Sequence, residues 1–156
     1  MMSVITKSAS YINQQLNSHF VTPEGGIAIW LTNLTGAPSV KGTLVETNET
    51  TEGGFEVLSD LYDCVGAVYD DGVADGEQCL IVVTGVAEVL LKDTTASVTG
   101  NWVKASDVNG RADATLPLPS GGTIAQLQEH FQEIGHCIET KTAGTDVLAK
   151  IVLHFN

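Results

Sequence analysis

Large apolar residues occur at every second position along several short stretches of the chain. In GGIAIWLTN, Ile27, Ile29 and Leu31 share one side of the alternation. Because successive side chains of a β-strand point to opposite faces, this spacing predicts a strand with one strongly apolar face. SVKGTLVE, at 39–46, predicts a second strand that contains a glycine, and another ordered stretch begins at Phe55.

Two segments, 64–85 and 133–156, have the same plan. Each contains an apolar residue followed by a glycine, a short strand, a polar connection rich in turn residues and a returning strand. This order predicts two related hairpins, with returning strands at 79–83 and 149–155. In the second returning strand, one face carries Ala149, Ile151, Leu153 and Phe155, and the other carries Lys150, Val152 and His154.

Gly85 interrupts the apolar run that begins at Cys79. The residues around it, VVTGVAE, lack the spacing of a phosphate-binding loop, and the β-branched residues that follow do not begin a helix. Gly85 is therefore predicted to be a bend or bulge that lets strand 79–83 continue into a strand at 86–92. Strand 79–83 is expected to be covered on both faces, by the core and by a neighbouring subunit.

The stretch from 101 to 135 combines a hairpin and a helix. Asn109-Gly110 predicts a type I′ turn within a hairpin at 101–115, and Pro117 and Pro119 exclude a central strand after it. A helix is predicted near 123–133. Its capping box is Thr123 with Gln126, and its apolar stripe consists of Ile124, Leu127, Phe131 and Ile134, just before Gly135.

These elements predict a mainly β fold, a compact β-barrel or β-sandwich with one short helix near 123–133. Residues 1–22 are predicted to form an N-terminal arm, extended or folded as a short helix, and 23–156 a single β-rich domain. The length of 156 residues suits one domain with a full core.

The charge balance excludes several function classes. The chain has 7 Lys and Arg against 19 Asp and Glu, a net charge of −12, with no basic cluster that could neutralise a run of phosphates. Direct nucleic-acid binding and docking on an anionic membrane are therefore not expected. The longest purely apolar run, 79–83, is far shorter than a membrane span, and the N-terminus lacks an apolar signal core, so production in a cytoplasm is expected.

Cysteines, histidines and carboxylates provide candidate chemistry but no recognisable site. Cys64, Cys79 and Cys137 are odd in number and lack CxxC spacing, which predicts free, buried thiols. Zinc binding by His130, His136 and Cys137 is not expected, because a helix and the two faces of a strand would point these side chains apart.

The acidic connection of the first hairpin raises the question of calcium. Asp70, Asp71, Asp75 and Glu77 are crowded there, but their spacing does not match a calcium-binding loop, and Asp-Gly pairs are common in turns. No catalytic residue, cofactor or metal is predicted, since no nucleophile motif is present. Core packing is the first interpretation of the two tryptophans. The candidate interface residues, chosen as apolar or aromatic positions on the arm and strands, are Tyr11, Ile12, Leu16, Phe20, Trp30 and Trp102.

An ordered set of segments resembles the small virion structural proteins of tailed bacteriophages, in particular capsid decoration or cement proteins. The segments are NLTGAPSVKGTLVE, VGAVYDDGVADG, VVTGVAEVLLKD, GNWVKASDVNGRADAT, EIGHCIE and AKIVLHFN, which cover the chain from about Ile27 onward. The resemblance implies a non-catalytic, oligomeric protein, with a trimer favoured, that is made in the host bacterial cytoplasm and binds the major capsid protein on the outside of the virion. The alternatives are another virion component, such as a head fibre, tail or baseplate module that could bind host glycans, and a small-ligand β-barrel or hydrolase.

Overall fold

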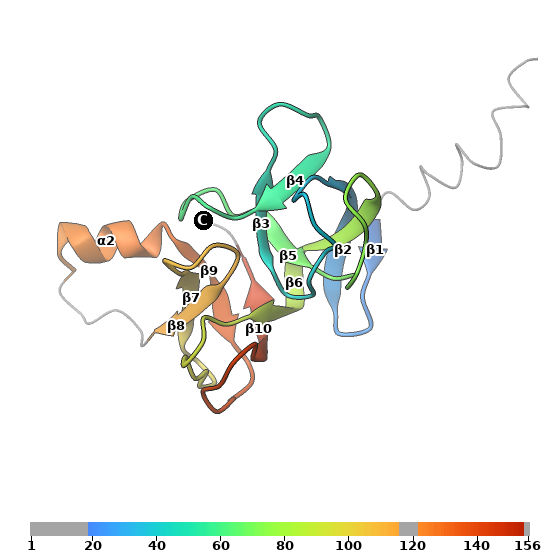
Figure 1. Cartoon of the computed structure of the whole chain (residues 1–156). Coiled ribbons are helices and arrows are strands. Elements are labelled where there is room, and N and C mark those ends of the chain that lie inside the picture. Colours follow the sequence, from blue (N-terminus) through green and yellow to red (C-terminus); the bar gives the residue numbers. More distant parts are fainter. Residues whose placement is uncertain (1–18, 116–121, 155–156) are drawn as a thin grey trace, which may run out of the picture.

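The computed structural model describes residues 19–115 and 122–154 (Figure 1). Within these ranges, ten strands belong to one sheet and one helix lies beside it, so the prediction of a mainly β fold is confirmed. The elements are β1 His19–Val21, β2 Gly26–Asn33, β3 Leu44–Thr47, β4 Gly54–Val57, β5 Gly66–Val68, β6 Gln78–Leu90, β7 Trp102–Ala105, β8 Ala112–Thr115, α2 Ile124–His130, β9 Glu133–Cys137 and β10 Leu148–Leu153.

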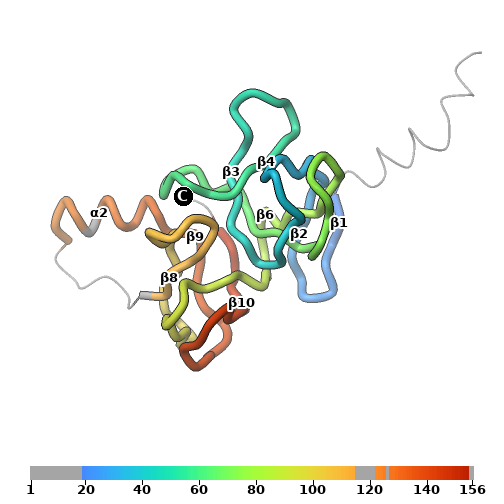
Figure 2. Tube along the Cα trace, in the orientation of Figure 1, coloured from blue at the N-terminus to red at the C-terminus, as the bar shows by residue number. Residues whose placement is uncertain are grey.

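The strand order is β1-β2-β4-β3-β5-β6-β10-β9-β7-β8, and β2 also pairs with β6. Because of this extra pairing, β2, β4, β3, β5 and β6 form a closed circuit of hydrogen-bonded neighbours. Only the β2–β4 pairing in this circuit is parallel. The sheet continues from the other half of β6 through β10, β9, β7 and β8. The long strand β6 therefore connects the closed circuit with these four strands (Figure 2).

Gly85 lies where β6 changes partner. Residues 78–85 of β6 pair with β2, whereas residues 85–90 pair with β10. Gly85 has φ +80°, and a Cβ placed on it would lie 2.5 Å from the carbonyl oxygen of Gly25. A side chain is therefore excluded by both conformation and space. The predicted bend is confirmed, within a strand that continues from 78 to 90.

The first half of β6 is buried on both faces, as predicted. Cys79 and Ile81 belong to a cluster with Phe55, whereas Leu80 and Val82 belong to the larger core cluster. Both clusters come from this chain itself, so the expectation that a neighbouring subunit covers one face is wrong. The closed circuit of strands explains the difference, because it places chain on each side of β6.

Both predicted hairpins are present, as β5–β6 and β9–β10. In each, a glycine stands where a Cβ would collide with the opposite strand: Gly66 with the carbonyl oxygen of Val82, and Gly135 with that of Val152. The predicted alternation in β10 is also confirmed, because Ala149, Ile151 and Leu153 are buried while Lys150 is exposed. Phe155, assigned to the same face, lies outside the described residues.

Two local predictions need correction. The strand expected at 39–46 begins only at Leu44, because Gly42 has φ +82° and its N–H donates to the carbonyl of Val68 in a turn. The hairpin at 101–115 exists as β7 and β8, but the type I′ turn is wrong, since only Gly110 of its two central residues has a positive φ. The β7–β8 loop is wider because Gly110 bonds to the backbone of Leu44 and Leu58.

The helix begins as predicted but ends earlier. The N–H of Leu127 donates to the carbonyl of Thr123 at 3.0 Å, and α2 ends at His130 instead of near 133. Ile134, predicted on the helical stripe, lies buried in β9. Residues 133–137 pair with β10 and β7 instead, and this pairing with distant strands overrides the local periodicity. The Gln126 side chain of the capping box lies outside the described part of the chain.

The end of the predicted arm belongs to the sheet. His19–Val21 form β1, which pairs antiparallel with β2. Residues 1–18, together with Pro117 and Pro119, lie outside the described residues.

Candidate functional site

Three of the four histidines surround one buried carboxylate, that of Glu133 at the start of β9. The Glu133 side chain is 2% exposed. Its Oε2 lies 2.8 Å from Nδ1 of His130, and its Oε1 lies 3.2 Å from Nδ1 of His136 and 3.5 Å from Nε2 of His154. The last two imidazoles are 3.0 Å apart, between Nδ1 of His136 and Nε2 of His154. We call these four residues the Glu133 cluster.

A bulge in β9 brings two members of the Glu133 cluster to one face. In a regular strand, Glu133 and His136 would point to opposite faces, because they are three residues apart. Against β7, however, the partners of Glu133 and Gly135 are consecutive residues, so Ile134 is an extra residue in the ladder. Glu133 therefore shares a face with His136, while Ile134 and Cys137 enter the core.

Neighbouring strands supply the rest of the cluster. Val152 of β10 pairs with His136, and His154, two residues further on, points to the same face as Val152. On the other side, Trp102 of β7 pairs with His136. The Trp102 ring lies 4.9 Å from the ring of His130 and 6.0 Å from that of His136, measured between centroids.

The Glu133 cluster combines the side chains that bind transition metals or exchange protons. A buried carboxylate is costly unless partners satisfy it, and three imidazole nitrogens lie within 3.5 Å of this one. The sequence analysis considered zinc with His130, His136 and Cys137 and expected these to diverge. Cys137 does turn into the core, but both histidines contact Glu133. Glu133 and His154 were missed, because the bulge and the β9–β10 pairing leave no local spacing signal.

In the acidic connection of the first hairpin, three aspartate carboxylates accept hydrogen bonds from backbone N–H groups. Asp70 accepts a hydrogen bond from the N–H of Leu80, Asp71 from that of Lys41, and Asp75 from that of Gly36. The Asp70 bond ties the connection to β6, and the other two bonds fasten it to the loop that precedes β3. Such contacts agree with the turn chemistry considered in the sequence analysis.

The three thiols are free, and two of them, Cys79 and Cys137, are buried. Desolvation raises the pKa of Cys64 to about 12 and also raises the pKa values of Cys79 and Cys137. All three are therefore protonated at neutral pH. A protonated thiol is a poor nucleophile and a poor metal ligand.

Three of the six candidate interface residues lie in the described part of the chain. Phe20 and Trp30 are 42% and 44% exposed, and Trp102 is half-buried beside the Glu133 cluster. In β2 the buried apolar side chain is Ala28, whereas Ile27, on the apolar face of the predicted strand, is 41% exposed. Tyr11, Ile12 and Leu16 lie outside the described residues.

An apolar surface that the candidate list missed lies on α2 and the residue that follows it. Ile124, Leu127 and Phe131, at helical spacing, are 80%, 59% and 59% exposed. In Figure 1 the helix projects from the side of the sheet next to β9. The i, i+3, i+7 pattern was visible in the sequence, but only the packing shows that it faces away from the core. We call these three residues the α2 stripe.

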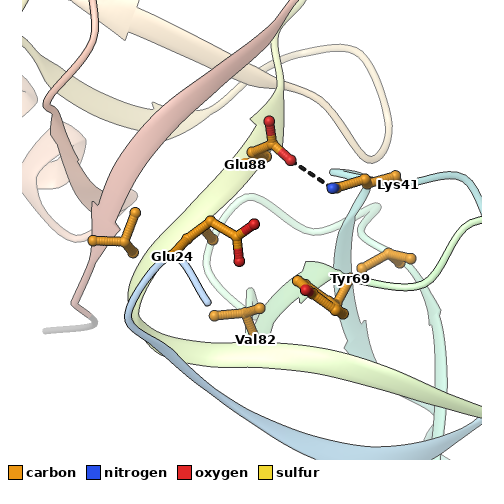
Figure 3. Close-up of a pocket in the computed structure, with 8 residues that line it drawn as sticks. Glu24, Lys41, Tyr69, Val82 and Glu88 are labelled. Atoms are coloured by element: carbon orange, nitrogen blue, oxygen red, sulfur yellow. Dashed lines mark ion pairs between the residues drawn. The ribbon is translucent and has the colours of Figure 1, made fainter. Parts of the chain in front are cut away.

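A small cavity lies where β6 meets the loop before β3 (Figure 3). Lys41 forms an ion pair with Glu88 there, and its ammonium lies 5.4 Å from the centroid of the Tyr69 ring. The hydrogen bond with Glu88 raises the pKa of Lys41. The cavity measures about 10 Å³, which suits one water molecule. Its side chains therefore hold the loop to β6 and leave no room for a substrate.

Comparisons with known proteins add no family. No protein-family model matches the chain, and no curated protein matches it. None of the helical structure described here is both long and apolar enough to cross a membrane.

Proposed function

We propose that the protein is a non-catalytic structural component of a tailed-bacteriophage virion that binds the outer surface of the capsid and stabilises it. The resemblance in the sequence suggests this class, and the α2 stripe is the observation that carries the proposal. A helix of seven residues is too short to be stable in isolation. Large apolar side chains on its outer face are typical of a helix that docks into a groove of a partner. We assign that groove to the major capsid protein.

A second apolar surface lies at the opposite end of the molecule. Val21 and Ile27 pair directly across β1 and β2 and are 65% and 41% exposed. In Figure 1, β1 and α2 lie on opposite sides of the fold. We assign the β1–β2 surface to a neighbouring copy of the chain in a homotrimer. A trimer that carries three α2 stripes bridges several capsid subunits, so modest affinity at each contact is sufficient.

The closed circuit of strands supports a more specific description of the fold. We infer that β2, β4, β3, β5 and β6 form a small β-barrel, because closure removes the free edges that an open sandwich sheet would have. A barrel supplies a rigid platform between the two apolar surfaces. The net charge of −12 keeps free subunits dispersed in the host cytoplasm before they reach the virion.

The first prediction concerns the α2 stripe. The double variant Leu127→Glu/Phe131→Glu is expected to fold normally, since both side chains are exposed, but to bind capsids at least about tenfold more weakly. The measurement is co-sedimentation with empty capsids of the phage that encodes the protein. Val40→Glu is the matched control, because Val40 is 53% exposed and lies in the loop before β3.

The outcomes separate the proposal from its alternatives. Binding by the wild type and the control, with a higher capsid melting temperature, supports the proposal. If the double variant binds capsids as tightly as the wild type, the α2 stripe is not the capsid-binding surface. Antibody labelling that finds the protein on tails or fibres favours another virion component, and its absence from virions overturns the proposal altogether.

A further inference from the structure

We propose that Glu133, His136 and His154 bind one divalent transition-metal ion, with zinc the best fit. The ligand atoms are Oε1 of Glu133, Nδ1 of His136 and Nε2 of His154, and they come from β9 and from the residue that follows β10. Two imidazole nitrogens and one carboxylate oxygen suit zinc, cobalt, nickel or copper. Calcium and magnesium prefer oxygen ligands only.

The separations between these atoms match those around a tetrahedral ion. Ligand bonds of about 2.0–2.1 Å at tetrahedral angles place ligand atoms about 3.3 Å apart. The three separations in the protein are 3.0, 3.2 and 3.5 Å. An ion can therefore lie just off the plane of these three atoms, at bonding distance from each, with only small movements of the side chains. Without an ion, one of the two imidazoles donates a hydrogen bond to the other.

The surroundings of the triangle resemble those of a built metal site. His130 contacts the other carboxylate oxygen of Glu133 at 2.8 Å and so fixes the orientation of the ligand group. Groups that hold a metal ligand in this way increase metal affinity. The imidazoles of His136 and His154 are about 40% exposed, at 41% and 43%, which gives an ion a path from solvent and leaves the fourth position to water.

The ion joins parts of the molecule that are far apart in sequence. It ties residue 154, beyond the end of β10, to β9, and through His130 it reaches the last residue of α2. Metal binding therefore also fixes the direction of the α2 stripe. An effect of this on capsid binding rests on the proposed capsid function, whereas metal binding itself does not.

The test uses the full-length protein, stripped with EDTA and titrated with zinc chloride by calorimetry at neutral pH. We expect one zinc ion per chain. His136→Ala and His154→Ala should each weaken binding at least about 100-fold, and His130→Ala about 10-fold. His19→Ala is the matched control and should bind like the wild type, because His19 lies on β1. Zinc at a hundred times its dissociation constant should raise the melting temperature by about 5 °C or more, except in the first two variants.

A spectroscopic measurement on the wild type tests the site even if the histidine variants fail to fold. Cobalt in a tetrahedral site with nitrogen and oxygen ligands gives intense visible absorption, whereas six-coordinate cobalt gives only weak bands. An intense spectrum that zinc abolishes supports the site. No binding by the wild type, weak octahedral absorption, or undiminished zinc affinity in both His136→Ala and His154→Ala overturns it. Because no capsid is involved, these results are independent of the capsid-binding test.

Discussion

At the residue scale, polar and reactive groups in this protein are matched to partners that the fold provides. Asp70, Asp71 and Asp75 each accept a backbone N–H. The Glu133 carboxylate is enclosed by imidazoles. The thiols, in contrast, are desolvated and kept protonated. The free cysteines are therefore packing residues here, in line with the buried thiols that their spacing predicts.

The thiols give a prediction about pH. The folded-state pKa of Cys64, about 12, lies above its ordinary value of 9.0, so its stabilising contribution is complete below pH 9 and is lost as pH rises toward 12. At pH 8, reaction of native Cys64 with a disulfide reagent should be about 1,000-fold slower than in urea. Cys64→Ala should flatten the loss of stability between pH 9 and 12. Equally fast reaction in the native and unfolded protein would contradict this assignment.

At the scale of single elements, irregularities within strands determine which side chains meet. In β6, Gly85 allows one continuous strand to pair with β2 before it and with β10 after it. In β9, the extra residue Ile134 turns Glu133 toward His136. Bulges of this kind change the face of the sheet to which side chains point, and they interrupt the regular hydrogen bonding between strands. The helix α2 contributes through its exposed stripe instead of through core packing.

The bend in β6 can be tested by a pair of alanine variants. Gly85→Ala should destabilise the protein by at least about 3 kcal/mol, because a strained φ is added to a collision with the backbone of Gly25. Gly76→Ala is the control, since Gly76 has φ +84° but no atom near its added Cβ, and should cost about 1 kcal/mol. Urea unfolding measures both. Equal costs would show that the close approach at Gly85 is unimportant.

At the scale of the whole molecule, the fold separates two apolar surfaces by a closed circuit of strands. The elements that carry them, α2 and β1, lie on opposite sides of the fold (Figure 1). Large exposed apolar patches on soluble proteins mark interaction sites. This arrangement is why we assign one surface to the capsid and the other to a second copy of the chain.

The oligomer is tested by light scattering coupled to size exclusion. The wild type should have three times the mass of the 16.4 kDa chain at micromolar concentrations. Val21→Glu/Ile27→Glu should shift the mass toward one chain, because it places charges in a contact from which water is excluded. Val40→Glu should remain a trimer. A monomeric wild type would remove the β1–β2 assignment without affecting the metal site.

Much of the fold was predictable where a local pattern carries the information. The face of β10 that holds Ala149 and Ile151, the two glycine-containing hairpins and the bend at Gly85 follow from alternation and backbone freedom. The early end of α2 and the wide loop at Gly110 were not predictable, because hydrogen bonds to distant strands decide both. The Glu133 cluster was not predictable for the same reason, since His154 approaches Glu133 only through the pairing of β10 with β9.

The sequence by itself therefore determined the β-rich class, the alternating faces, the acidic surface and the absence of a nucleotide-binding motif. These properties depend on residue type and on spacing over a few positions. Only the tertiary structure decided that β2 closes onto β6, that β6 is covered by its own chain on both faces, and that three histidines meet one buried glutamate. Each of these depends on pairing between strands far apart in the chain, for which the gain in hydrogen bonds and burial is a property of the whole fold.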